Sequence, residues 1–180
     1  VLVKLEARFE ERPLPRVSII DMREQLKKGN RLALSLELRE DLSQCLKKGE
    51  QAMLFLNRRG YAGFVSCRSC GHVMKCPHCD VSLSEHNGRK LICHYCGYET
   101  VKPDKCPVCS SPYIGGFKAG TQQIQQVVEK EFPEARVLRM DYDTTRAKGS
   151  YEKILSAFSR HEADILIGTQ MIVKGHDFPD

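Results

Sequence analysis

The chain has 180 residues, of which 41% are hydrophobic, and a formal net charge of +5. This length accommodates one domain of ordinary size and a small second one. The net charge is +4 over residues 1–66, +2 over 67–110 and −1 over 111–180, so no broad basic face of the kind that dominates nucleic-acid affinity is evident. The sequence contains no run of 18 or more apolar residues, and we expect no membrane-spanning helix and no membrane partner.

The first 66 residues predict two strands and one helix. Residues 16–20 (RVSII) form a short apolar run that favours a strand. Over residues 35–48 leucines recur at helical spacing, and Gly49 follows as a stop signal. Residues 51–56 are apolar after the first position, which is typical of a strand buried on both faces.

Eight of the nine cysteines form four Cys-x-x-Cys pairs within 43 residues. The pairs are Cys67/Cys70, Cys76/Cys79, Cys93/Cys96 and Cys106/Cys109. They supply two sets of four sulfur ligands, the donor set of two structural zinc ions. A disulfide framework is the alternative, but the sequence shows no secretion signal, and unoxidised thiols favour a reducing cytoplasm. The ninth cysteine, Cys45, lies on the apolar stripe of the predicted helix, and we interpret it as a core residue.

Spacing favours a nested combination of the four pairs. Thirteen residues separate Cys79 from Cys93, enough for two short strands with a turn at Asn87-Gly88. We expect one metal site from Cys76, Cys79, Cys93 and Cys96, and the other from Cys67, Cys70, Cys106 and Cys109. A crossed combination, first pair with third and second with fourth, stays open. His72, His78 and His94 are not needed as ligands, because eight sulfurs fill two sites. Apolar residues are few in this segment, so its folding should depend on metal.

Strand and helix patterns alternate after the cysteine-rich segment. Residues 113–117, 136–140 and 164–168 are predicted strands, and residues 122–132 and 151–158 predicted helices. This alternation implies a parallel α/β sheet into which the cysteine-rich segment is inserted. Because the chain begins without methionine, we expect a piece of a longer protein. We divide it into residues 1–15 (a linker or the end of a preceding domain), 16–66 (the first part of an α/β lobe), 67–110 (a two-zinc insertion domain) and 111–180 (the continuation of the lobe).

Polar residues follow three of the predicted strands. They are Arg58 and Arg59 after the first, residues 141–145 after the second, and Thr169, Gln170, Lys174 and Gly175 after the third. In parallel α/β sheets, ligands bind beyond the carboxyl ends of the strands. Guanidinium, hydroxyl and backbone N–H groups at one edge would form an anion-binding rim. We expect phosphate there, from a nucleotide or a nucleic acid; solvated loops are the alternative.

Residues 115–121 have the glycine spacing of a nucleotide phosphate loop but not its lysine. Thr121 stands where that lysine is required, after Gly120. An acidic pair after an apolar strand, which would hold magnesium for phosphoryl transfer, is also missing from the sequence. We therefore expect no ATP hydrolysis by this chain alone and assign no catalytic residue.

Several motifs together resemble the primosomal protein N′ family, the replication-restart DNA helicases of superfamily 2. The similar stretches are the four cysteine pairs, 55–61 (FLNRRGY), 120–122 (GTQ), 139–145 (RMDYDTT) and 164–179 (DILIGTQMIVKGHDFP). The resemblance runs from about residue 16 to the end. It implies an incomplete second RecA-like lobe carrying a two-zinc insertion, and it agrees with the nested pairing.

By that resemblance, the parent protein uses ATP and Mg²⁺ to unwind DNA 3′ to 5′ and helps to reload the replicative helicase. The implied partners are forked and single-stranded DNA, primosome proteins and single-strand-binding protein. Residues 164–179 would correspond to a motif that couples nucleotide to DNA, with Thr169, Gln170 and Lys174 as candidates for phosphate contact. The family's phosphate loop, acidic magnesium motif and arginine finger match nothing in this sequence.

Two other functions stay open. A non-enzymatic zinc adaptor would bind proteins or single-stranded DNA through the insertion. Aromatic and basic residues in the insertion and just before it would stack on a single strand and neutralise its charge. Alternatively, they would only pack the metal-binding turns. These residues are Tyr61, Phe64, Tyr95, Tyr98, Arg58, Arg59, Arg68 and Arg89. A thiol oxidoreductase would instead require reactive thiols.

Overall fold

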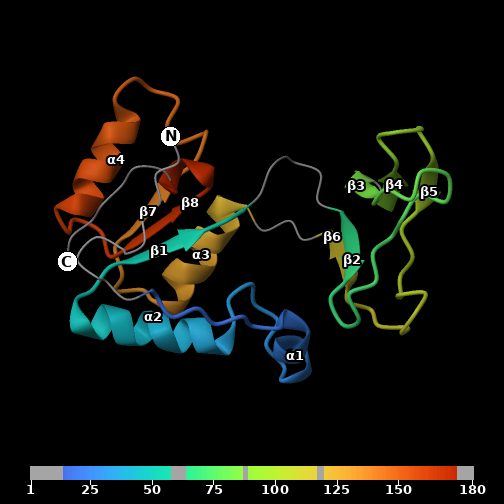
Figure 1. The fold of residues 1–180 in the computed structure, drawn as a ribbon, viewed down its shortest axis with the longest axis horizontal. Coiled ribbons are helices and arrows are strands. Elements are labelled where there is room, and N and C mark those ends of the chain that lie inside the picture. Colours follow the sequence, from blue (N-terminus) through green and yellow to red (C-terminus); the bar gives the residue numbers. More distant parts are fainter. Residues whose placement is uncertain (1–13, 58–63, 87–88, 117–119, 174–180) are drawn as a thin grey trace, which may run out of the picture.

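The computed structural model describes residues 14–57, 64–86, 89–116 and 120–173, which form an α/β part and a separate antiparallel part (Figure 1). The α/β part is built on a parallel sheet in the order β1–β8–β7. Its strands are β1 (Ala52–Phe55), β7 (Val137–Met140) and β8 (Ile165–Gly168). The parallel sheet predicted from the alternation of strands and helices is therefore present.

Helices cover both faces of this sheet. They are α2 (Leu36–Lys48), α3 (Thr121–Glu131) and α4 (Ser150–Ser159). Successive side chains of a strand point to opposite faces. Ile165 and Ile167 accordingly pack in a core with Leu42 of α2 and Val128 of α3, whereas Leu166 packs in a second core with Phe158 of α4. All four residues of β8 are buried, because this strand is the central one of the sheet.

The three predicted helices are confirmed, and their ends follow from local chemistry. Ser35 caps α2 by accepting a hydrogen bond from the N–H of Leu38, and Gly49 ends it with a φ of 76°. Helix α3 ends at Glu131, just before Pro133, which disfavours continuation of a helix through the residue before it.

Strand β1 lies at the edge of the sheet, so the prediction of a strand buried on both faces was wrong. Leu54 contributes to the core against α2 and α3, but Met53 and Phe55 are 40% and 47% exposed. Their face is open because α4 packs against β7, on the other side of β8. An apolar composition alone does not distinguish a central strand from an edge strand with one open face.

The strand predicted over residues 16–20 is also wrong. This stretch is irregular, with Val17 and Ile19 82% and 94% exposed, and it precedes the short helix α1 (Met22–Lys27). A strand needs a neighbour that supplies backbone hydrogen bonds. No strand among the described residues pairs with this segment.

The antiparallel part contains two small sheets. Strand β2 (Val65–Cys67) pairs with β6 (Ile114–Gly116), and β3 (Ser84–His86), β4 (Lys90–Ile92) and β5 (Glu99–Val101) form the second sheet. The strand predicted near residues 113–117 therefore exists but does not join the parallel sheet. Hairpin β3–β4 matches the two strands expected between the inner cysteine pairs; its predicted turn, Asn87-Gly88, lies outside the described residues.

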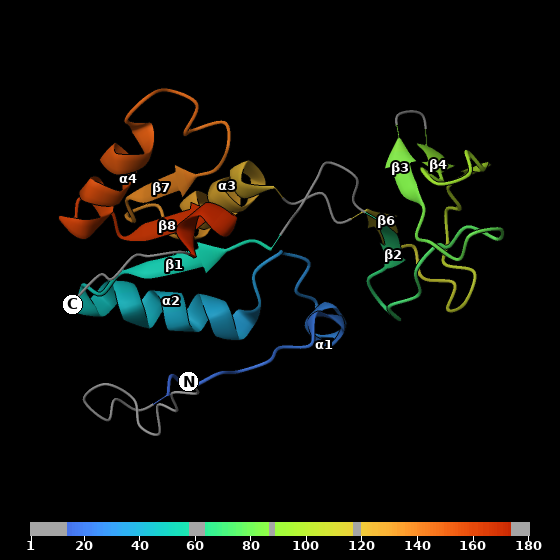
Figure 2. The ribbon, with the colours of Figure 1, turned by 45° about the horizontal axis from the view of Figure 1, so that its top comes forward.

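Figure 2 shows the two antiparallel sheets well away from the parallel sheet, with α1 lying between the two parts. The chain leaves the α/β part after β1 and returns to it at α3. Among the described residues, no helix has both the length and the apolarity needed to cross a membrane.

Candidate metal centres and the carboxyl edge of the sheet

The eight paired cysteines gather into two groups of four. One group is Cys67, Cys70, Cys106 and Cys109, here called the outer cluster; the other is Cys76, Cys79, Cys93 and Cys96, the inner cluster. Within each group all sulfurs lie within 4.8 Å of one another. This grouping is the nested combination, because the first pair joins the fourth and the second joins the third.

The sulfur spacing fits a tetrahedral metal ion. The Sγ atoms of Cys67 and Cys109 are 3.6 Å apart, and those of Cys70 and Cys106 are 3.7 Å apart. In the inner cluster the Cys76 and Cys96 sulfurs are 3.6 Å apart. Zinc–sulfur bonds of about 2.3 Å in a tetrahedron separate the sulfurs by about 3.8 Å, whereas a disulfide needs about 2.05 Å. The two clusters are therefore compatible with two structural zinc ions.

Each cysteine pair sits on the same tight turn. In the first, the N–H of Gly71 donates to the carbonyl of Cys67 at 2.8 Å, and the N–H of Cys67 donates to the carbonyl of His72 at 2.7 Å. The other three pairs repeat both bonds at distances between 2.8 and 3.0 Å. The same two hydrogen bonds give each ligand pair the same backbone turn, which sets where its sulfurs point.

The residue after each second cysteine has a positive φ. Gly71 and Gly97 take values of 81° and 76°, and Asp80 and Ser110 take values of 54° and 57°. Glycine favours a positive φ, so Asp80 and Ser110 are the two positions that residue type alone would miss. The signal that would have found them is their shared position directly after a Cys-x-x-Cys pair, since aspartate tolerates this conformation better than most residues.

Neighbouring groups lower the pKa of some cysteine thiols and raise the pKa of others. Burial raises the pKa of Cys67, but backbone hydrogen bonds, the largest from Cys70, outweigh it and lower the pKa to about 6. The N–H of Cys96 likewise lowers the pKa of Cys93 to about 7, whereas a hydrogen bond with the Cys96 sulfur raises the pKa of Cys79 to about 12. Thiolates this close repel one another, so a cation is needed before all four ionise together.

The histidines and Cys45, which were not expected to be metal ligands, lie outside both clusters. His78 packs edge-on against Tyr98, with ring centroids 5.4 Å apart, and His94 faces His86 with 3.1 Å between their Nε2 atoms. Neither cluster contains a histidine among the described residues, and Cys45 is half-buried on α2. The four-sulfur composition expected for each site therefore matches the grouping in the structure.

The three parallel strands end side by side, which brings the segments after them to one edge. Gly168 of β8 is in register with Phe55 of β1 and Met140 of β7. Asp141 and Thr169 therefore follow neighbouring strands at the same edge. The residues predicted to bind phosphate beyond β7 and β8 thus leave adjacent strands, as expected for a parallel sheet.

Only part of the predicted phosphate-binding set can be placed. Thr169 is half-buried and Gln170 is exposed, at the start of the 3-10 helix η3 (Gln170–Ile172). The other four candidates lie outside the described residues; they are Arg58, Arg59, Lys174 and Gly175. Residues 115–116, once compared with a phosphate loop, lie in strand β6.

Asp141 ties the start of α3 to the end of β7. Its carboxylate accepts hydrogen bonds from the Thr121 hydroxyl and, at 3.0 Å, from the N–H of Thr144, and it pairs with Arg139 at 3.0 Å. Burial raises the pKa of Asp141, but the bond from Thr121, the Thr144 contacts and the charge of Arg139 outweigh it and leave the pKa below its ordinary value. The negative charge at this edge is thus already neutralised within the protein.

Replacing Thr121 with valine should destabilise the α/β part by about 1–2 kcal/mol, because a buried carboxylate loses a hydrogen bond. Thr121→Ser keeps the hydroxyl and should cost less. Since the folded pKa of Asp141 is depressed, the stability it contributes is present above its unfolded pKa near 3.8 and is lost as the pH falls through the lower folded value. Urea unfolding at pH 7 and pH 3.5 measures both effects; an equal loss for valine at the two pH values would contradict this role.

Five of the eight aromatic and basic residues proposed to stack on a single strand are described, and three of these five contact other groups of the protein. Tyr98 packs on the core of the antiparallel part, Arg89 pairs with Asp104, and Arg68 donates to a backbone carbonyl. Tyr95 is 85% exposed, and Phe64 is also exposed. Tyr61 lies outside the described residues.

An α/β lobe of RecA-like type, interrupted by an insertion with two four-cysteine clusters, defines the class of this chain. A family model described as the PriA DNA helicase Cys-rich region domain matches residues 76–100. The chain is 54% identical over 180 residues to the replication restart protein PriA of Bacillus subtilis (strain 168), an alignment that covers 99% of this chain and 22% of that protein. The chain belongs to the PriA family.

More distant relatives carry the same name. The identity to replication restart protein PriA is 50% over 180 residues for Synechocystis sp., covering 97% of this chain and 22% of that protein. For Treponema pallidum it is 38% over 176 residues, covering 97% of this chain and 26% of that protein. The chain thus spans roughly a quarter of the length of the curated relatives it matches.

Proposed function

We propose that this chain is the part of an ATP-dependent 3′–5′ DNA helicase that carries a DNA-contacting sheet edge and a zinc-bound insertion. The parent would act in replication restart and primosome assembly. One observation carries the proposal: the insertion departs after β1 at the carboxyl edge of the sheet, and returns at α3, which Thr121 and Asp141 hold to that same edge. DNA held at this edge would therefore lie close to the base of the insertion.

The eight cysteines would hold two zinc ions, the outer cluster one and the inner cluster the other. Zinc with four thiolate ligands supplies cross-links and no catalytic chemistry, because no coordination position stays open. Burial of Cys67, Cys76, Cys93 and Cys106 among Val65, Leu83 and Leu91 supports a structural role. Reactive thiols, which an oxidoreductase needs, are not favoured by this arrangement.

At the sheet edge, phosphates of DNA or nucleotide would contact the candidate side chains. Thr169 and Gln170 offer a hydroxyl and an amide there, and Arg58, Arg59, Lys174 and Gly175 complete the proposed set. Forked and single-stranded DNA, primosome proteins and single-strand-binding protein are the proposed partners, with ATP and Mg²⁺ required by the parent. A reducing cytoplasm suits thiolate-bound zinc.

We propose domain boundaries that follow the pairing of strands and not the positions of the cysteines. The boundaries at 66/67 and 110/111 cut β2 and leave β6 on the lobe side, although these two strands pair with each other. An insertion that begins at about residue 64 and ends at about residue 116 keeps this pair intact. Residues 14–57 and 120–173 then form the lobe.

The protein should bind single-stranded DNA at low salt but show negligible DNA-stimulated ATP hydrolysis. Substituting Thr169→Ala with Gln170→Ala should weaken binding about 30-fold, since two hydrogen bonds to charged phosphate are lost and each contributes on the order of 1 kcal/mol. Gln126→Ala, on the exposed face of α3, is the matched control and should bind as the wild type does. Fluorescence anisotropy over a salt titration, together with a phosphate-release assay, tests this.

Two results would decide against the proposal. Robust DNA-stimulated ATP hydrolysis by the chain would contradict the proposal, because its sequence contains no phosphate loop. No DNA binding at low salt would favour the alternative, a zinc adaptor that contacts proteins. The exposed side chains of Tyr95, Val101 and Val108 in the insertion support that second function.

A further inference from the structure

Residues 21–34, here called the α1 segment, include helix α1, which lies between the two parts of the molecule (Figure 2), and they contact both parts. On the lobe side the segment is anchored by Gln25, which is 2% exposed. The side-chain oxygen of Gln25 accepts from the N–H of Leu36 at 2.9 Å, and its amide donates to Glu37 at 2.8 Å. Leu34 packs in the core with Leu42 of α2. These contacts attach the segment to the lobe.

On its other side the α1 segment reaches the turn that carries Cys67 and Cys70. Arg68, inside that turn, donates from Nη1 to the carbonyl of Arg31 at 3.1 Å. The guanidinium of Arg31 stands 5.5 Å from the centre of the Tyr113 ring. Nη1 of Arg23 lies 3.8 Å from the position that a Cβ on Gly71 would occupy. Each contact involves a residue next to or near the outer cluster.

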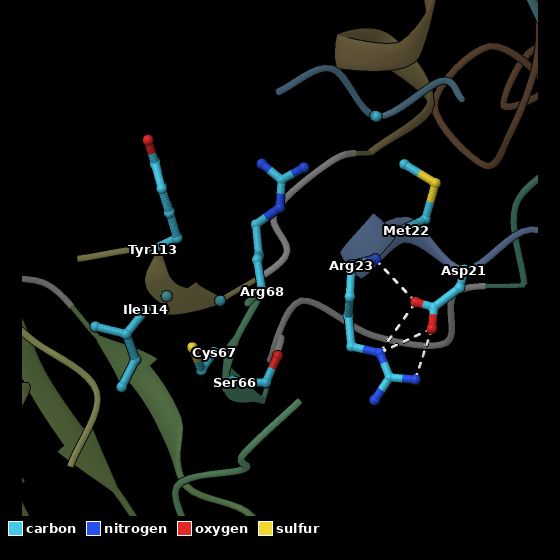
Figure 3. Close-up of a pocket in the computed structure, with 11 residues that line it drawn as sticks. Asp21, Met22, Arg23, Ser66, Cys67, Arg68, Tyr113 and Ile114 are labelled. Carbon is cyan, nitrogen blue, oxygen red and sulfur yellow. Dashed lines mark hydrogen bonds and ion pairs between the residues drawn. The ribbon is translucent and has the colours of Figure 1, made fainter. Parts of the chain in front are cut away.

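These contacts span an open groove and do not form a packed core. The groove has a volume of about 550 Å³ and lies between α1 and strands β2 and β6 (Figure 3). Its polar groups already have partners within the protein: Arg23 pairs with Asp21 at 2.6 Å, and Arg68 bonds to Arg31. A few exposed polar contacts over an open groove are individually weak. The contacts between the α1 segment and the Cys67–Cys70 turn, here called the seam, therefore persist only while the segment and the turn are both ordered and correctly placed.

Metal at the outer cluster would keep the Cys67–Cys70 turn ordered and correctly placed beside the α1 segment. Four thiolates around one divalent ion carry a net charge of −2 beside the Arg23 guanidinium, which is half exposed. The ion also fixes the backbone of the Cys67–Cys70 turn, on which the donor Arg68 is mounted. Without metal, the Cys67–Cys70 turn that carries Arg68 loses its cross-link.

We propose that the α1 segment is a metal-dependent clamp, which holds the insertion against the lobe only when the outer cluster carries its ion. The clamp rests on the metal ligation proposed above. The three contacts named here involve no residue of the inner cluster, so the inner ion stabilises the tip of the insertion without acting on the clamp. The direction in which the insertion projects from the sheet edge then depends on the outer site alone.

Two matched variants separate the sites. Cys109 and Cys96 are both exposed and are both the last ligand of their cluster, so Cys109→Ser and Cys96→Ser should each remove one of two ions. Hydrogen exchange by mass spectrometry then follows residues 21–34, where the N–H of Asn30 bonds to the carbonyl of Gln25. We expect exchange in this segment to rise at least tenfold in Cys109→Ser and to stay at the wild-type rate in Cys96→Ser.

A further variant, with two arginines replaced, leaves all eight cysteine ligands intact. Arg23→Gln combined with Arg68→Gln should keep two ions, measured by elemental analysis, yet raise exchange in residues 21–34; Arg160→Gln, an exposed arginine in the lobe paired with Glu162, should not. Equal exchange in the two cysteine variants, or unchanged exchange in the double arginine variant, overturns the clamp. Fewer than two ions in the wild type overturns the metal proposal itself, so the two failures are distinguishable.

Discussion

Removal of metal with a chelator should unfold the insertion and leave the parallel sheet intact. Among the residues that the structure describes, the core of the insertion contains four buried aliphatic residues besides its cysteines, namely Val65, Leu83, Leu91 and Ile114. Structural zinc contributes on the order of 10–16 kcal/mol of apparent binding free energy in peptides of this kind, far more than such a core supplies. We expect loss of amide dispersion for residues 64–116 in NMR spectra and rapid proteolysis there, both reversed by added zinc.

A cysteine substitution outside the clusters provides the control for this experiment. Cys45→Ser on α2 should retain two ions and the response to chelator of the wild type, whereas Cys76→Ser, at a buried ligand, should lose one ion. Unchanged circular dichroism and protease resistance after complete metal removal would show that the insertion folds without its ions.

Gly168→Ala should destabilise the lobe by about 3 kcal/mol, the upper range for an overpacked core. A Cβ at this position would lie 2.5 Å from Cγ2 of Ile172 and 2.7 Å from the backbone oxygen of Met140. The backbone oxygen cannot move away without displacing β7, so β8 or the turn into Thr169 must shift. Urea denaturation monitored by circular dichroism measures the loss.

The matched control is Gly120→Ala, at the start of α3. A Cβ there meets no atom within 4 Å, and its φ of −79° suits any residue. Its cost should stay below about 1 kcal/mol, the usual effect of alanine at such a cap. Similar losses for the two variants would mean that close packing at the carboxyl edge does not explain the glycine at 168.

Short apolar runs predicted the strands of the parallel sheet but not which strands are neighbours. Residues 51–56 and 164–168 are similarly apolar, yet β1 is an edge strand with Phe55 half exposed and β8 is central and buried. Residues 113–117 formed a strand as predicted, but β6 pairs with β2. Which strands pair depends on contacts far apart in the sequence, and local composition does not encode them.

The metal centres were predictable to a greater extent because their geometry is local. Each Cys-x-x-Cys pair sits on a turn closed by hydrogen bonds within six residues, so spacing alone determined where the ligands are. Spacing also favoured the nested grouping, through the room it leaves for hairpin β3–β4. The sequence therefore determined the eight sulfurs, the three helices α2, α3 and α4, and the parallel direction of the strands in the lobe. Only the tertiary structure decided the open edge at β1, the pairing of β2 with β6, and the contacts of Arg23, Arg31 and Arg68 across the seam. These three contacts join residues 37 to 82 positions apart, and the approach of such residues depends on how both parts pack.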